Sequence, residues 1–254
     1  MIDSKNFINT RHKNQKINYD NVLKELIKEW KKQEIRPKLL IHSCCAPCST
    51  YVLEYLTEVS DLTIFFSNSN IHPKEEYIKR MLVQKDFIDE FNKRNNSKIK
   101  FIADEYNPNK FIKAVKGYED EREGGERCHI CYEMRLDSAA KKAFKLGYDY
   151  FASALTLSPK KNAQVINESG YELQEKIEVF YLPSDFKKNN GYNRSIEMCE
   201  DYNIYRQCYC GCVFAAKDQG IDFKEVNQNA KEYNLKHKNY EKYKSLLKTG
   251  SELL

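Results

Sequence analysis

The sequence predicts an α/β fold with a mainly parallel sheet of about five strands and helices on both faces. Short apolar runs bounded by turn residues alternate with longer segments whose apolar residues recur every three or four positions. Repeated strand–helix order requires crossover connections, which make neighbouring strands parallel. The 254 residues suffice for a sizeable core, and no internal repeat interrupts the pattern.

The elements before residue 117 begin with a helix at 19–33, where Val22, Leu26 and Trp30 share one helical face ahead of Pro37. Apolar runs between turn residues then predict strands at 38–43, 62–67 and 98–103. Helical periodicity between and after these runs predicts helices at 52–59, 75–95 and 111–116. The first half of the chain therefore repeats the strand–helix unit.

The pattern continues after a polar loop at 117–127, because Leu136, Ala140 and Phe144 predict a helix at 128–146 that Gly147 ends. Strands are predicted at 149–155 and 178–182, and helices at 160–177 and 191–202. We therefore expect a Rossmann-like α/β catalytic domain over 37–216, an N-terminal helical extension over 1–36 and a charged helical tail over 217–254. Functional groups of such a domain gather where its strands end.

The composition and the absence of several motifs exclude or disfavour some classes of protein. Lys and Arg number 42 against 37 Asp and Glu, a mildly basic balance that fits a polyanionic partner but also ordinary solvated helix faces. No apolar stretch approaches the roughly 18 residues of a membrane span, and no secretion signal opens the chain, so we expect a cytoplasmic protein. Phosphate-binding glycine loops and an H-E-x-x-H motif are absent, which disfavours nucleotide hydrolases, nicotinamide enzymes and zinc proteases.

Eight of the nine cysteines fall into three groups, and in a reducing compartment such groups favour metal ligands or redox thiols over structural bridges. The first group follows the first sheet strand, the second opens a helix and the third follows the last helix of the sheet pattern. Their sequences are HSCCAPCS, RCHICYEMRL and RQCYCGCVF, which contain Cys44, Cys45 and Cys48, then Cys128 and Cys131, then Cys208, Cys210 and Cys212. Parallel strands would bring these groups to one edge of the sheet.

Two kinds of metal site fit these groups about equally on spacing alone. Cys-x2-Cys pairs commonly bind zinc, which needs four ligands. The consecutive pair Cys44–Cys45 fits poorly around a single ion but can reach different irons of an iron–sulfur cluster. The Cys210-Gly211-Cys212 segment allows two interpretations as well: a dithiol that stores two electrons, or two further metal ligands.

Taken together, the motifs resemble the iron–sulfur epoxyqueuosine reductases of the QueH type. The matching segments run in order from Leu39 to Ala215 and comprise HSCCAPCS, FFSNSNIHPKEEY, RCHICYEMRL, SALTLSPKKN, SDFKKNNGYNRS and YCGCVFA. Cys199 and Cys208 lie outside the family pattern. The resemblance implies reduction of the epoxide of epoxyqueuosine at the wobble position of tRNA to queuosine, with loss of water and electrons from an external donor.

The resemblance also implies site residues. It assigns Cys44, Cys45, Cys128 and Cys131 to a [4Fe-4S] cluster and Cys210 and Cys212 to a redox-active disulfide pair. It associates a second metal ion, iron, with the site, for which Cys48 and Asp185 are the candidate ligands; Asp185 is also a candidate acid or an ordinary turn carboxylate. The alternatives to this function are a zinc-stabilised RNA-binding module and a thiol-dependent sulfur-transfer enzyme acting on tRNA.

Recognition of an anticodon nucleotide requires cations for phosphates and rings for stacking. The candidates, each of which also fits plain surface exposure, are Lys160, Lys161, Lys187, Lys188, Arg194 and Arg206, with Tyr192 and Tyr209 as rings. Arg127 and Arg135 flank the Cys-x2-Cys turn and could support the metal ligands. His42 and His72 are either polar site residues or ordinary loop histidines.

Overall fold

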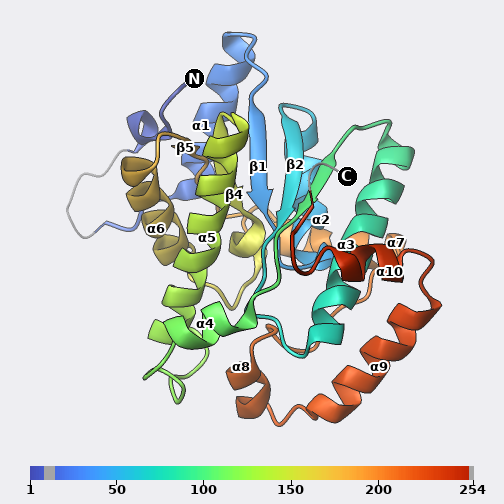
Figure 1. Ribbon diagram of the computed structural model, residues 1–254. Helices are drawn as coiled ribbons and strands as arrows, with labels where there is room; N and C mark the ends of the chain where they lie inside the picture. Colours follow the sequence, from blue (N-terminus) through green and yellow to red (C-terminus); the bar gives the residue numbers. More distant parts are fainter. Residues whose placement is uncertain (9–14, 252–254) are drawn as a thin grey trace.

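Five parallel strands form one sheet in the order β3-β2-β1-β4-β5 (Figure 1). The strands are β1 (Lys38–His42), β2 (Asp61–Phe66), β3 (Lys100–Ala103), β4 (Tyr150–Ser153) and β5 (Phe180–Tyr181). This computed structural model describes residues 1–8 and 15–251, so positions 9–14 and 252–254 of the predicted terminal extensions lie outside it. The predicted α/β class and parallel sheet are confirmed.

Both faces of the sheet are apolar because successive side chains of a strand point to opposite sides. In β1, Leu39 and Ile41 belong to one hydrophobic core, and Leu40 belongs to another. The same alternation separates Phe66 from Phe65 in β2. Each face therefore needs a layer of helices to exclude water.

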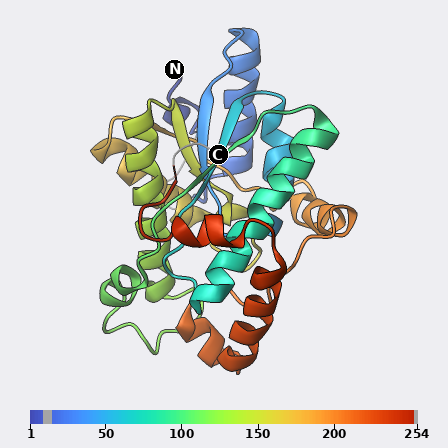
Figure 2. The same ribbon diagram turned by 45° about the vertical axis from the view of Figure 1, so that its right-hand side comes forward.

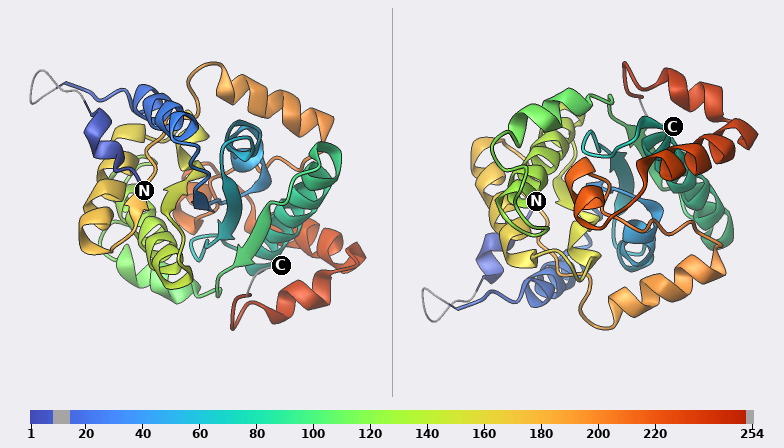
Figure 3. Two further views of the ribbon diagram at one scale, coloured as in Figure 1. Left: turned by 90° about the horizontal axis from the view of Figure 1, so that it is seen from above. Right: turned by 90° about the horizontal axis from the view of Figure 1, so that it is seen from below.

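Helices cover both faces, which is clearest from above (Figure 3). The helices α5 (Glu126–Leu146) and α6 (Ala163–Lys176) pack together on one face. The helices α1 (Tyr19–Lys32), α2 (Ala46–Thr57), α3 (Lys74–Asn95) and α7 (Gly191–Asp201) contribute to the core on the other face. The predicted helices at 19–33, 75–95, 128–146 and 191–202 match these elements within two residues at each end.

Several predicted elements differ from the structure at their ends. The helices predicted at 52–59 and 111–116 begin earlier, at Ala46 in α2 and at Pro108. The strand predicted at 149–155 stops at Ser153, whose side chain accepts a hydrogen bond from the Leu155 N–H and starts the 3₁₀ helix η2 (Ala154–Leu157). The helix predicted at 160–177 begins only at Ala163, because the Asn162 side chain caps it. The strand predicted at 178–182 pairs over the two residues of β5.

The remaining elements are η1 (Ser4–Phe7), α4 (Pro108–Ala114), α8 (Val213–Asp218), α9 (Phe223–Lys236) and α10 (Tyr240–Ser245). The predicted helical tail is thus present, and α9 and α10 pack against α3 (Figure 2). Seen from below, α8 lies over the edge where the strands end (Figure 3). Within the described part of the chain, every helix is too short or too polar to cross a bilayer.

The strand order places a topological switch point between β1 and β4. From β1 the chain adds β2 and β3 on one side, whereas β4 and β5 extend the sheet on the other side. Loops that follow β1 and β4 therefore diverge at this point and leave a crevice outside the carboxyl ends of the strands. The first cysteine group follows β1 directly, so it enters this crevice.

Candidate metal and redox site

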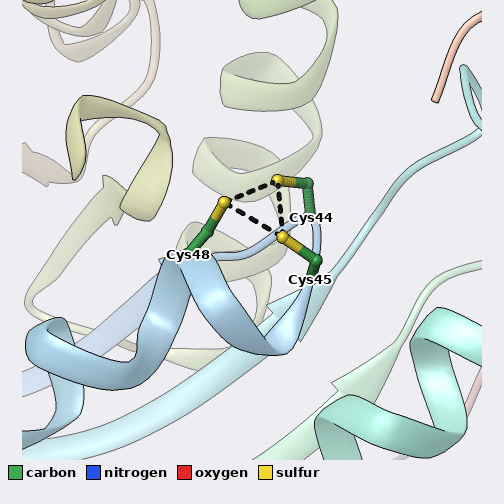
Figure 4. Close-up of side chains that lie close together, drawn as sticks. All are labelled: Cys44, Cys45 and Cys48. Atoms are coloured by element: carbon green, nitrogen blue, oxygen red, sulfur yellow. Dashed lines mark hydrogen bonds between the residues drawn. The ribbon is translucent and has the colours of Figure 1, made fainter. Parts of the chain in front are cut away.

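Three thiols converge directly after β1 (Figure 4). The sulfur atoms of Cys44 and Cys45 lie 3.6 Å apart, those of Cys44 and Cys48 3.4 Å, and those of Cys45 and Cys48 3.0 Å. Cys45 is the extended residue that precedes α2, and the three-residue step to Cys48 places both on one side of the first helical turn. Among the described residues, this is the one group of three potential ligands whose donor atoms all lie within 4.8 Å.

The close thiols have different affinities for protons. Hydrogen bonding with Cys45 and Cys48 holds the pKa of the Cys44 thiol well below its usual value. Burial raises the pKa of Cys45, and the hydrogen bond to Cys44 raises that of Cys48. Cys44 is therefore the first of the three to become a thiolate, the form that binds metal.

The second and third cysteine groups meet at the opening turn of α5. Cys131, Cys210 and Cys212 belong to one apolar cluster with Phe111 and Ala215. Burial raises the pKa of Cys131 to about 12, and the nearby sulfurs of Cys210 and Cys212 add to this rise. Thiols separated by many residues in the chain therefore lie close enough to influence one another.

Cys128, the other cysteine near the start of α5, contacts a different hydrophobic cluster from Cys131. It packs against the hydrophobic cluster that contains Cys44 and Cys45, and its sulfur accepts a hydrogen bond from the Gly124 N–H at 3.2 Å. The part of α5 that carries Cys128 and Cys131 thus contacts two hydrophobic clusters, one with Cys44 and Cys45 and the other with Cys210 and Cys212.

Two buried cations lie between the cysteine groups. Burial lowers the pKa of Arg135, but the sulfurs of Cys131, Cys210 and Cys44 outweigh it and leave that pKa above its usual value. Burial opposes the charge of Lys161 in the same way, and Cys210, Cys44 and Cys48 raise its pKa. Arg135 donates from Nε to the Cys131 carbonyl at 3.0 Å, while its buried Nη1 and Nη2 have no hydrogen-bond partner.

A cavity of about 200 Å³ opens beside the thiols at the switch point. Its walls come from the loops after β1 and β4, from α7 and from the segment before α8. Sulfur-bearing, cationic and aromatic side chains line it, among them Cys44, Cys48, Cys208, Cys210, Lys160, Lys161, Arg206, Tyr192 and Tyr209. Five predicted recognition residues thus surround the cavity that the thiols face.

The Cys210-Gly211-Cys212 turn requires its glycine. Gly211 has φ +126°, a backbone conformation that side-chain-bearing residues rarely adopt, and an added Cβ would lie 2.9 Å from Ile71 Cγ1. Both cysteines are free thiols, so the predicted disulfide is not present in this structure. Cys212 caps α8 by accepting from the Ala215 N–H, and burial raises the pKa of Cys212 to about 11.

Asp185 follows β5 and is buried beside Lys187, with Lys187 Nζ 2.6 Å from Asp185 Oδ1. Neither residue lines the cavity beside the thiols. The second-metal role of Cys48 and Asp185 remains a prediction, as does the cluster set of Cys44, Cys45, Cys128 and Cys131.

The two candidate histidines are engaged in the scaffold. His42 is fully buried and contacts Ser153 Oγ at 2.9 Å and the Ser67 carbonyl at 3.1 Å; burial lowers its pKa to about 4. His72 contacts the Asn70 carbonyl through Nδ1 at 3.0 Å, and its partial burial lowers its pKa. His42 is therefore a neutral structural group at neutral pH.

Other predicted cations lie in ion pairs or hydrogen bonds elsewhere. Arg194 pairs with Glu54 at 2.7 Å, and Lys188 donates to the Asn18 side chain at 3.0 Å. Arg127 is buried and links the Glu119 carbonyl to Asp218, so it connects the start of α5 to α8.

Two polar contacts of the site were not predicted from the sequence. Gln207 Nε2 lies 2.9 Å from Cys45 Sγ. Arg80 of α3 donates to the carbonyls of Cys210 and Tyr209. Glu and Arg four residues apart on a helix, such as Glu76 and Arg80, ordinarily form a surface ion pair. Their spacing therefore did not indicate that Arg80 is buried. The one available indication was its neighbourhood of apolar residues in the predicted helix.

The donor set fits a metal that prefers thiolates. Three sulfurs meet within 4.8 Å, and two buried cations lie beside them. Soft sulfur ligands select zinc, copper(I) or iron–sulfur centres. A negatively charged centre would also offer partners to the unpaired Nη1 and Nη2 of Arg135, which are costly to bury alone.

Comparisons with known proteins agree on one family. The family model described as epoxyqueuosine reductase QueH matches residues 39–218, which span β1 to the end of α8. The chain is 62% identical to the epoxyqueuosine reductase QueH of Staphylococcus aureus, over 88% of this chain and 94% of the relative. The protein of that name from Streptococcus pyogenes is 54% identical, over 92% of this chain and 91% of the relative. The one from Thermotoga maritima is 34% identical, over 75% and 96%.

Proposed function

The chain belongs to the QueH family of epoxyqueuosine reductases, and we propose on that premise that it reduces the epoxide of epoxyqueuosine in tRNA to queuosine. The observation that carries the proposal is the cavity at the switch point, where thiols from two cysteine groups face the same space as lysine, arginine and tyrosine side chains. A zinc-stabilised RNA-binding module and a sulfur-transfer enzyme are not favoured, because the matched relatives are named as reductases.

The reaction balances with two electrons and two protons. The two carbon–oxygen bonds of the epoxide break, the carbon–carbon double bond of the cyclopentene forms, and the oxygen leaves as water. The thiols of Cys210 and Cys212 provide two electrons and two protons when they join as a disulfide. An external electron donor then returns the pair to thiols.

The metal assignment is part of the proposal. Cys44, Cys45, Cys128 and Cys131 would hold a [4Fe-4S] cluster, and Cys48 with Asp185 would hold a second iron. When bound, such a cluster supplies electrons one at a time. The support for it is the converging thiols and the buried Arg135 and Lys161, whose charges would offset that of an anionic centre.

The chain's own residues would orient the substrate. The cavity takes one nucleoside splayed out of the anticodon loop, with Lys160 and Arg206 near its phosphates. Tyr192 offers a ring for stacking. The buried Lys161 faces the thiols from the cavity wall, where its ammonium can donate a hydrogen bond to the departing epoxide oxygen. We place this reaction in the cytoplasm, where tRNA is modified.

The test is a reductase assay on protein purified without oxygen. Wild-type protein with a chemical electron donor and tRNA that carries epoxyqueuosine should yield queuosine by nucleoside mass spectrometry. Cys212→Ser should keep its iron and sulfide content but lose at least a hundredfold in rate, since a lone thiol cannot form the disulfide. Unchanged epoxyqueuosine with fully metal-loaded wild-type protein, or a thiolated base as product, would reject the proposed function.

A further inference from the structure

The Cys210-Gly211-Cys212 turn is held by a residue of α3 that lies far away in the sequence. Arg80 donates from Nη1 to the Cys210 carbonyl at 3.0 Å and from Nη2 to the Tyr209 carbonyl at 3.3 Å. The planar guanidinium therefore binds two consecutive carbonyls and fixes the direction of the backbone that enters the turn.

The charge of Arg80 is neutralised inside the protein. Its Nε donates to Glu76 Oε1 at 2.7 Å, and both side chains are only 1% exposed. Burying two charges costs free energy unless the pair is close and its remaining hydrogen-bonding groups are satisfied. The two carbonyls give Nη1 and Nη2 of Arg80 an acceptor each, and Tyr205 Oη donates to Glu76.

Other contacts of the turn converge on the same place. The His72 N–H donates to the Gly211 carbonyl at 2.8 Å, and the Tyr209 hydroxyl donates to the His72 carbonyl. A Cβ at Gly211 would lie 3.0 Å from Arg80 Nη1, so the turn and the guanidinium are in direct contact. The Arg80 guanidinium also lies over the Tyr209 ring, with Cζ 5.0 Å from the ring centroid.

We propose that Arg80 is a positioning residue that holds this turn in its dithiol conformation and thereby shifts the Cys210–Cys212 pair toward the reduced form. The inference rests on the proposed function, in which this pair supplies two electrons. In the conformation that Arg80 holds, both thiols are free and Cys212 Sγ accepts from the Ala215 N–H. Oxidation joins the two sulfurs with loss of two electrons and two protons, and the new bond has to close across Gly211 in a turn whose backbone Arg80 fixes.

The experiment measures the thiol–disulfide equilibrium without tRNA. Wild type and Arg80→Lys are equilibrated in buffers of oxidised and reduced dithiothreitol, trapped with an alkylating reagent, and the Cys210–Cys212 peptide is analysed by mass spectrometry. Lysine keeps the positive charge but cannot bind two carbonyls at once. We expect the equilibrium constant to shift about tenfold toward the disulfide, in line with the loss of a charged hydrogen bond.

The matched control is Arg94→Lys, on the same helix. Arg94 pairs with Glu90 at 2.7 Å in the same i,i+4 geometry, but both side chains are exposed. We expect its equilibrium constant to equal that of wild type. We also expect Arg80→Lys to lower kcat with little change in KM and iron content. The equilibrium between the Cys210–Cys212 thiols and their disulfide shifts, while the cavity and the group of Cys44, Cys45 and Cys48 stay in place.

The possible results separate the role of Arg80 from the role of the Cys210–Cys212 pair. An unchanged equilibrium in folded Arg80→Lys overturns the role of Arg80, and a loss of iron in place of a redox shift does the same. If Arg80→Lys does not fold, Glu76→Gln is measured instead; it keeps an acceptor for Arg80 and should shift the equilibrium in the same direction by about threefold. A wild-type protein that forms no disulfide at Cys210 and Cys212 rejects the redox pair of the proposed function itself.

Discussion

Arg135 is a buried cation that lies beside the cysteine sulfurs of the candidate site. It is almost fully buried, and two of its nitrogens have no partner, although a buried guanidinium without partners is costly. The nearby sulfurs of Cys131, Cys210 and Cys44 raise its pKa, so the guanidinium stays charged despite its burial. The two nitrogens without a partner would gain acceptors from an anionic group such as the thiolate-bound metal centre proposed above.

Cys128→Ala tests the four-cysteine ligand set. A four-thiolate site has no spare ligand, so we expect this variant, purified without oxygen, to lose most of its iron and sulfide. Cys199→Ala is the matched control, since Cys199 is a buried cysteine outside the three groups. Full iron and sulfide in Cys128→Ala, measured chemically and by visible absorption, would contradict this assignment.

Cys48→Ala separates the cluster from the proposed second metal. If Cys48 binds a separate ion, we expect the variant to lose about one iron per chain and to retain all of its acid-labile sulfide. Loss of sulfide together with iron would show instead that Cys48 is a ligand of the cluster itself. Inductively coupled plasma analysis and sulfide determination on the same sample make the comparison.

The strands and long helices could be predicted because their apolar residues and turn residues form local patterns. The apolar steps of α1, α3 and α5 and the short runs of β1 and β2 are local properties of the chain. The ends of β4 and α6 were less predictable, because side-chain caps from Ser153 and Asn162 decide them. The length of β5 depends on pairing with β4, which no local pattern specifies.

The residue types of the candidate site could be predicted from the sequence. The residues that hold the cysteine segments in place could not. The position of Cys44, Cys45 and Cys48 after a strand indicated a site at the edge of the sheet, and they do converge there. Arg80 and Gln207 were not predicted, because each acts on a segment distant in sequence. Their roles follow from tertiary packing alone.

Gly211→Ala tests the turn before α8. With φ at +126° and Ile71 Cγ1 2.9 Å from the new Cβ, we expect a loss of about 1–3 kcal/mol in the free energy of unfolding. Gly220→Ala is the control, because φ is +63° and no atom lies within 4 Å of the added Cβ. Urea denaturation gives both values; equal losses in the two variants would show that the turn tolerates a side chain.

Burial of tyrosine side chains, nearly complete for Tyr19 and partial for Tyr55 and Tyr106, limits the stability of the whole molecule at alkaline pH. The chain has 18 tyrosines, and burial raises the pKa of Tyr19, Tyr55 and Tyr106 to about 12. An unfolded tyrosine ionises near pH 10. Because the folded pKa values are higher, the stability that these groups contribute is complete below pH 10 and is lost as the pH rises toward 12.

We therefore expect a cooperative alkaline transition between pH 10 and pH 12. Tyrosinate absorbance at 295 nm should rise together with the loss of helical circular dichroism, since ionisation of a buried ring such as that of Tyr19 favours unfolding. The same protein in concentrated urea should titrate smoothly near pH 10. Ionisation of all tyrosines with the helical signal intact would contradict the expectation.

On the free side of β3, the last residue of the strand is bound by Ser251, the last residue that the structure describes. Ser251 binds both backbone groups of Ala103, as its N–H donates to the Ala103 carbonyl at 2.7 Å and its Oγ accepts from the Ala103 N–H at 2.8 Å. Just beyond the strand, the Tyr106 N–H donates to the Leu247 carbonyl at 2.8 Å. An uncovered outer strand offers its backbone as a template for aggregation. A version of this protein shortened before Leu247 would therefore expose the backbone of Ala103 and become prone to aggregation through β3, even with every cysteine intact.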